Sequence, residues 1–176
     1  MASTDPSPAG ERTARLWVRS HSPFGAAPKR ATVLDSLEAL EDGGYFEDVT
    51  ARLWGKRVGL STMASRTEEG ADILDSVAEF RAWADRTGAR IEQFFPTRQM
   101  ESKLVEERYI VQELPTLALA EYEDGELVHV TPCVADGSVE TVEDRVSTIS
   151  AMADIEAARE SERDGSEREL APAKVQ

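Results

Sequence analysis

A single cysteine, Cys133, and two histidines are the only thiol and imidazole groups among the 176 residues. One cysteine excludes an intrachain disulfide, a zinc ribbon and the CxxC chemistry of redox proteins. The histidines, His21 and His129, are isolated in the sequence, and together with one cysteine they make a poor metal site. We therefore predict no metal and no cofactor. Both histidines are interpreted as structural or solvated, and Cys133 as a small buried hydrophobe.

Long apolar runs are also missing, and no stretch approaches the length of about 18 residues that a membrane span requires. The N-terminal residues MASTDPSPAGERTAR contain no apolar segment of the kind found in a secretory signal. These absences favour a cytoplasmic protein without a membrane partner. Neither a GxSxG serine elbow nor a glycine-rich phosphate loop occurs. The loop pair His21 and Ser22 supports only a minor enzymatic hypothesis, and no catalytic residue is assigned.

Lysine is scarce in a chain that carries strong negative charge. Thirty-four acidic residues face 20 basic ones, for a net charge of -14, and only four of the basic residues are lysines. An acidic surface whose main cation is arginine suits a salt-loaded cytoplasm, because molar salt shortens the Debye length to about 3 Å and screens self-repulsion. The overall charge then says little about binding partners, and local departures from it become informative.

Two segments depart sharply from this acidic background. Residues 12–34 and 49–67 together hold nine basic residues and no Asp or Glu in 42 positions. At the average composition of the chain, these segments would contain about eight carboxylates. Such an asymmetry marks one surface of the protein as unusual.

Both segments repeat a pattern of basic, aromatic and basic residues at every second position. Because side chains of a strand alternate between its two faces, neighbouring strands carrying this pattern would place two tryptophans among four cations. The predicted site comprises Arg15, Trp17, Arg19, Arg52, Trp54, Lys56 and Arg57. Indole rings and arginines of this kind suit nucleic acid, a nucleotide or another anion. The same face is alternatively a homodimer interface or a scaffold in which the tryptophans pack under a helix.

Periodicity divides the chain into one globular domain at residues 12–158, a disordered N-terminal tail at 1–11 and a charged, disordered C-terminal tail at 159–176. Strands are predicted at 12–20, 49–58, 90–100, 108–122 and 126–131, the last two joined by an Asp-Gly hairpin turn. Helices are predicted from Pro28 to Gly43, from Thr67 to Gly88, and onward from Ser138 or Thr141.

The predicted fold class is α/β (α+β), with element order β-α-β-α-β-β-β-α. A mixed sheet is expected, with helices mainly on one face and its first two strands parallel.

The segment ELPTLALAEYEDGELVHV, residues 113–130, resembles the last hairpin of thioredoxin-like proteins. This likeness implies a thioredoxin-like scaffold without redox activity, because the loop SHSPFGAAPK carries no cysteine. Over most of the core, the phrases LWVRSHSP, LWGKRVGLS, VAEFRAWADRTG, LAEYEDGEL and TVEDR resemble a family of small, acidic haloarchaeal proteins. Its members usually bear the name helix-turn-helix domain-containing protein, which implies a transcription-related role. Residues 37–53, where a recognition helix would lie, instead read as helix, Gly-Gly stop and strand.

The sequence thus predicts a non-enzymatic binding or regulatory protein of a halophilic archaeon. It would engage an anionic partner, DNA or RNA among the candidates, through the face of Arg, Trp and Lys side chains. The alternative is a homo-oligomeric structural or adaptor protein that uses the same face as its interface.

Overall fold

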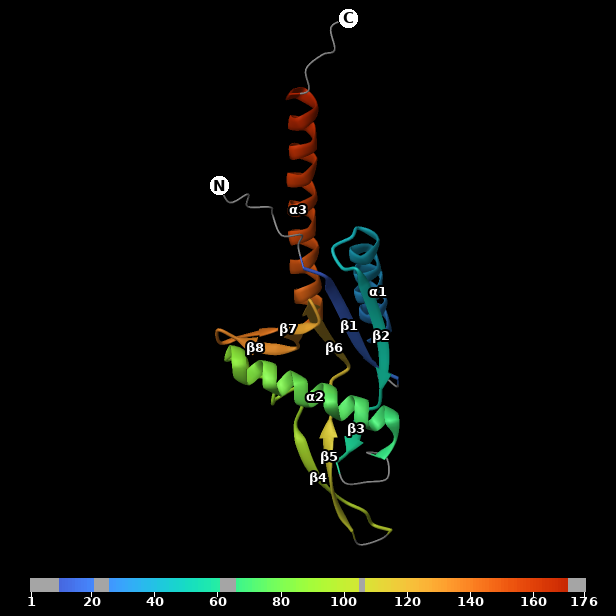
Figure 1. Cartoon of the computed structure of the whole chain (residues 1–176). Helices are drawn as coiled ribbons and strands as arrows, with labels where there is room; N and C mark the ends of the chain where they lie inside the picture. The colour runs from blue at the N-terminus through green and yellow to red at the C-terminus, as the bar shows by residue number, and fades with distance from the viewer. Residues whose placement is uncertain (1–9, 21–25, 61–65, 105–106, 171–176) are drawn as a thin grey trace, which may run out of the picture.

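A computed structural model describes residues 10–20, 26–60, 66–104 and 107–170 of the chain (Figure 1). Its elements, in order, are β1 (Arg12–Arg19), α1 (Ala26–Asp42), β2 (Asp48–Trp54), β3 (Arg57–Gly59), α2 (Glu68–Thr87), β4 (Thr97–Glu101), β5 (Arg108–Glu113), β6 (Leu117–Glu123), β7 (Glu126–Thr131), β8 (Cys133–Ala135), β9 (Ser138–Glu140) and α3 (Val142–Leu170). This mixed α/β content confirms the predicted fold class.

A four-stranded sheet with the order β2-β1-β6-β7 forms the centre of the fold. The pair β1–β2 is parallel, as the sequence predicts, whereas β6 runs antiparallel to both β1 and β7. The parallel pair is joined through α1, and the antiparallel pair β6–β7 through a tight turn.

Helices cover both faces of this sheet. On one face, α1 and α3 pack with β1 and β6 in a core that includes Leu16, Leu37 and Ile149. On the other face, α2 packs over Trp17 and the neighbouring apolar side chains. The sequence predicted helices mainly on one face, and two of the three described helices do share one. The opposite face is apolar too, which explains why α2 buries it.

A second sheet, with the order β3-β5-β4, extends away from the central sheet (Figure 1). Two predicted strands are each divided between the two sheets: residues 49–58 form β2 and β3, and residues 108–122 form β5 and β6. The second break surrounds Pro115, which has no N–H group to donate to a ladder. The strand predicted at 90–100 is also shorter than expected. Only Thr97–Glu101 is a strand, since the Phe95 amide donates to the Ile91 carbonyl in a preceding turn.

Helix boundaries follow the predicted capping signals. Thr67 caps α2 by accepting a hydrogen bond from the Gly70 amide at 3.0 Å, and Gly88 ends α2 in the left-handed conformation with φ 76°. Thr141 caps α3 reciprocally with Asp144: the Asp144 amide donates to the Thr141 hydroxyl, and the Thr141 amide donates to the Asp144 carboxylate.

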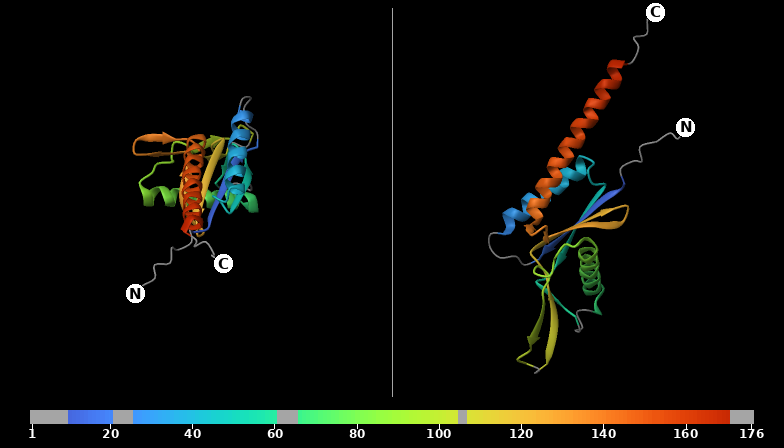
Figure 2. Two further views of the ribbon diagram at one scale, coloured as in Figure 1. Left: turned by 90° about the horizontal axis from the view of Figure 1, so that it is seen from above. Right: turned by 90° about the vertical axis from the view of Figure 1, so that its left-hand side faces the viewer.

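The end of α3 corrects the predicted domain boundary. This helix continues to Leu170, through residues that the sequence assigned to a disordered tail beginning at 159. Figure 2 shows its C-terminal half projecting beyond the rest of the fold. A disordered tail was predicted because this segment lacks an apolar stripe. The prediction was wrong, since a polar helix can continue from a packed N-terminal half without such a stripe. None of the helices in the described part of the chain is long and apolar enough to cross a lipid bilayer.

The cap of α3 predicts a pH effect. Hydrogen bonds from Thr141 lower the pKa of Asp144 below its ordinary value of 3.8. A carboxyl with a lowered folded-state pKa contributes stability above its unfolded-state pKa and loses that contribution as the pH falls through the folded-state value. We expect the parent to be more stable than the variant Asp144→Asn above pH 3.8, with the difference shrinking in more acidic solution. Urea unfolding at pH values above and below 3.8 measures this difference in stability, with Asp154→Asn as the control. A constant difference at every pH would contradict the assignment.

Candidate functional site

The strand register brings the predicted basic and aromatic residues together. Trp17 of β1 lies opposite Arg52 of β2, and Arg19 lies opposite Trp54. All four side chains therefore share one face of the central sheet, as does Arg15, two residues before Trp17. That face is the one against which α2 packs.

The two tryptophans form part of the core. Their rings stack with centroids 5.0 Å apart and an interplanar angle of 14°. Trp17 is only 3% exposed and Trp54 only 2%. The Trp54 indole N–H donates to the Pro115 carbonyl at 3.0 Å, and Phe95 contacts the Trp54 ring edge-on. The prediction that these rings offer exposed stacking faces is wrong, because α2 and residue Phe95 cover them.

Arg15 and Arg19 are half-buried and engaged within the chain. The Arg15 guanidinium lies 5.6 Å from the centre of the Tyr122 ring. Tyr122 in turn donates its hydroxyl to Glu79 of α2 at 3.2 Å, and burial raises the pKa of Tyr122 to about 12. The Arg19 guanidinium donates to the Leu114 carbonyl. These two arginines link β1 to the elements packed around it.

Three of the predicted residues, Arg52, Lys56 and Arg57, are exposed, and we call them the basic edge. The Arg52 side chain is 50% exposed and lies 3.8 Å from the carboxylate of Asp72. Lys56 and Arg57 form no ion pair with any described residue, although Arg57 contacts the sulfur of Met100 at 3.4 Å. The basic edge begins on β2 and continues into β3.

Negative charge lies closer to this surface in space than the sequence indicates. A groove of about 460 Å³ between the sheet and α2 is lined by Arg15 and Arg52 on one side. Asp72, Asp75 and Glu79 of α2 line the other side. The two segments that contain no Asp or Glu, residues 12–34 and 49–67, therefore contribute arginines that face the acidic surface of α2. Of the predicted site, Lys56 and Arg57 are not among the residues that line this groove.

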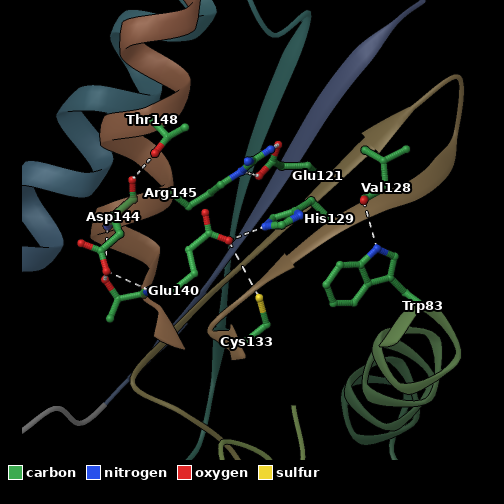
Figure 3. Close-up of polar contacts among 10 residues, drawn as sticks. Trp83, Glu121, Val128, His129, Cys133, Glu140, Asp144, Arg145 and Thr148 are labelled. Carbon is green, nitrogen blue, oxygen red and sulfur yellow. Dashed lines mark hydrogen bonds and ion pairs between the residues drawn. The ribbon is translucent and has the colours of Figure 1, made fainter. Parts of the chain in front are cut away.

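A second polar cluster joins His129, Cys133 and Glu140, for which the sequence predicts no common site. Figure 3 shows the carboxylate of Glu140 between the imidazole of His129 and the thiol of Cys133. Glu140 Oε2 lies 2.7 Å from His129 Nε2 and 3.9 Å from Cys133 Sγ. Cys133 is fully buried, whereas the side chains of His129 and Glu140 are 21% and 26% exposed. Burial, together with the charge of Glu140, raises the pKa of the Cys133 thiol to about 11.

Short turns build this cluster. Asp136 and Gly137 both have positive φ, 50° and 79°, and they close the β8–β9 hairpin that pairs Cys133 with Glu140. His129 comes from within β7, four residues before the cysteine. This second Asp-Gly turn was the signal that could have revealed the cluster, because it fixes the register that sets Glu140 opposite Cys133.

Two further contacts surround the cluster. The Trp83 ring of α2 meets the His129 ring edge-on, with centroids 5.4 Å apart. On the other side, Arg145 of α3 forms two hydrogen bonds with Glu121 of β6, at 2.6 and 2.8 Å. The cluster thus lies where the sheet, the β8–β9 hairpin and the start of α3 meet. His21 and Ser22, which carried the enzymatic hypothesis, lie outside the described residues.

The chain was compared with families of known proteins, with curated proteins and with solved structures. Residues 6–154 match a family model described as a helix-turn-helix domain. No curated protein and no solved structure matches the chain. In the described residues, strands separate every consecutive pair of helices, so these residues contain no two helices joined by a short turn. The prediction of a strand after Gly43-Gly44 is confirmed, since β2 occupies Asp48–Trp54.

Proposed function

Because the chain belongs to the helix-turn-helix domain family, we propose that it is a regulatory protein that binds nucleic acid through the basic edge. The observation that carries this proposal is the exposure of Arg52 on β2, Lys56 in the connection that follows and Arg57 at the start of β3, in a chain of net charge -14. Cations placed in this way neutralise phosphates and release their counterions.

Phosphate contact, rather than base stacking, is the mechanism that the geometry supports. Trp17 and Trp54 are buried and therefore unavailable to bases. Arg57 can bind a phosphate oxygen pair through its planar guanidinium, while Lys56 supplies a point charge nearby. Contacts of this kind position a protein on a nucleic acid without reading its sequence.

The same geometry bears on the alternative of self-association. Stacked tryptophans enriched at an interface would favour a homodimer, but these tryptophans are sealed by α2 within one chain. Self-association of two copies through this face therefore cannot use the indole rings, which are buried in each chain. Nucleic acid is the partner with the complementary charge.

Neutralising the basic edge tests the proposal. We expect the variant Arg52→Gln, Lys56→Gln, Arg57→Gln to bind a mixed-sequence DNA duplex more weakly than the parent. In a plot of log affinity against log salt concentration, its slope should be shallower by about 0.9 for each phosphate that the variant no longer neutralises. Fluorescence anisotropy at several salt concentrations measures both quantities, and a single-stranded RNA of matched length extends the test to the other class of nucleic acid.

A matched control lies on the projecting half of α3. The variant Arg159→Gln, Arg163→Gln, Arg168→Gln removes the same number of exposed cations far from the basic edge, and we expect it to bind like the parent. Equal decreases in affinity in both variants would assign binding to general charge, and an unchanged affinity of the basic-edge variant would refute the proposal.

A further inference from the structure

We propose that His129, Cys133 and Glu140 bind a divalent metal ion of the zinc class. Their ligand atoms, one from each residue, all lie within 4.8 Å of one another. This site is separate from the basic edge and does not depend on nucleic-acid binding.

The donor set selects the kind of metal. An imidazole nitrogen, a thiolate sulfur and a carboxylate oxygen are the ligands that zinc takes in proteins, whereas Mg²⁺ and Ca²⁺ prefer oxygen alone. Three protein ligands leave one position of a tetrahedral ion open for water or another donor. The same donors accept Co²⁺, which can replace zinc as a spectroscopic probe.

The spacing of the three atoms is close to what an ion requires. With zinc–ligand distances of about 2.0–2.3 Å, neighbouring donor atoms of a tetrahedral site lie about 3.3–3.7 Å apart. The separation between Glu140 and Cys133 is 3.9 Å, and that between His129 and Glu140 is 2.7 Å. The third pair, His129 and Cys133, lies within 4.8 Å. Binding therefore needs the direct bond between His129 and Glu140 to open by less than about 1 Å and the imidazole and the thiol to come up to about 1.5 Å closer, adjustments that rotations of the partly exposed His129 and Glu140 side chains supply.

An ion bound by these three residues would connect separate elements of the fold. His129 belongs to β7, while Cys133 and Glu140 begin and end the β8–β9 hairpin. Val142, the first residue of α3, follows Glu140 after a single residue. An ion at this point ties the edge of the central sheet to the hairpin and to the start of the long helix. Glu140 and His129 are partly exposed, so the ion can enter from solvent.

Cobalt provides the most direct test, because a thiolate–cobalt bond gives a charge-transfer band that surface carboxylates cannot produce. The full chain, freed of any purification tag, is titrated with Co²⁺ under reducing conditions. We expect a thiolate–cobalt band that saturates at one equivalent, together with visible bands of a tetrahedral ion. Added Zn²⁺ should abolish both. Fluorescence of Trp83, whose ring contacts His129, should change in step with the absorption.

Single substitutions assign the ligands. We expect Cys133→Ser to lose the charge-transfer band and His129→Gln and Glu140→Gln to weaken binding by about 100-fold or more, since even partners outside the ligand shell contribute about 10–100-fold. Glu143→Gln, in the first turn of α3 and outside the cluster, is the matched control and should bind like the parent. Circular dichroism establishes that each variant is folded before titration.

Two results would overturn the proposal. One is the absence of a thiolate–cobalt band from the folded parent at millimolar Co²⁺, which would leave the three residues as a hydrogen-bonded cluster. The other is equal binding by the parent and the His129 and Glu140 variants, which would assign the metal to the thiol alone or to the acidic surface. A rise in the thermal midpoint with Zn²⁺ that is specific to the parent would support the site independently.

Discussion

Replacing Arg145 with leucine will lower the free energy of unfolding by about 3–5 kcal/mol, the cost of leaving one partner of a buried ion pair uncompensated. Glu121, only 5% exposed, accepts hydrogen bonds from two nitrogens of the Arg145 guanidinium. These bonds also raise the pKa of Arg145 above its ordinary value. The pair joins β6 to α3, so we expect its removal to detach the start of the helix from the sheet. Urea unfolding monitored by circular dichroism measures the change.

Two further variants serve as controls for the stability change expected of Arg145→Leu. Arg163→Leu removes an exposed arginine from the same helix, and we expect its effect to stay within about 0.5 kcal/mol. The double variant Glu121→Leu, Arg145→Leu replaces the charged pair with an apolar one, which is often neutral or stabilising, and should recover most of the stability. A small effect of Arg145→Leu alone would show that water reaches Glu121 and that the pair is not a buried one.

Local signals in the sequence were sufficient to predict where most elements begin and end. Thr67 and Gly88 delimit α2 because a side-chain cap and a left-handed glycine depend only on neighbouring residues. The Asp124-Gly125 turn is equally local, and both of its residues have the positive φ that such a hairpin needs. Strand breaks near Gly55 and Pro115 were missed, because a strand-like pattern that continues past a break does not reveal that the chain passes from one sheet to another.

Features that depend on packing between distant elements could not be predicted in this way. The alternation of Arg15, Trp17 and Arg19 correctly placed their side chains on one face, but it could not show that α2 covers that face. Likewise, His129 and Cys133 are only four residues apart, but Glu140 joins them only through the β8–β9 pairing. A periodic pattern gives the direction of a side chain, whereas its exposure is decided by the element that packs on it.

Because Trp17 and Trp54 are buried, the basic residues beside them fall into two groups with different expected roles. Arg15 and Arg19 stabilise the interior through Tyr122 and the Leu114 carbonyl, so their charge is used within the chain. Lys56 and Arg57 lie beyond the end of β2, past the stacked rings, and keep their charge in solvent. Variants of the buried and exposed parts of the same pattern should therefore have opposite phenotypes, the first in stability and the second in binding.

Replacing Trp54 with alanine should lower the free energy of unfolding by about 3–5 kcal/mol, the range for removing a buried large aromatic side chain. The variant lacks the stack with Trp17, the edge contact with Phe95 and the hydrogen bond to Pro115. Leu53→Ala, at the adjacent and 69% exposed position, is the control and should change stability by less than about 0.5 kcal/mol. Acrylamide should quench the fluorescence of the folded parent only weakly, because all three tryptophans are buried.

The conservative variant Trp54→Phe separates stability from binding. We expect it to remain folded, to be less stable than the parent, and to bind nucleic acid within about twofold of the parent, since the ring that it changes does not reach solvent. The basic-edge variant should do the reverse, keeping its stability while losing affinity. A folded Trp54→Phe variant that loses as much affinity as the basic-edge variant would show that bases do stack on this pair. Binding would then require α2 to move away from the sheet, and hydrogen exchange in α2 would have to increase when nucleic acid is added.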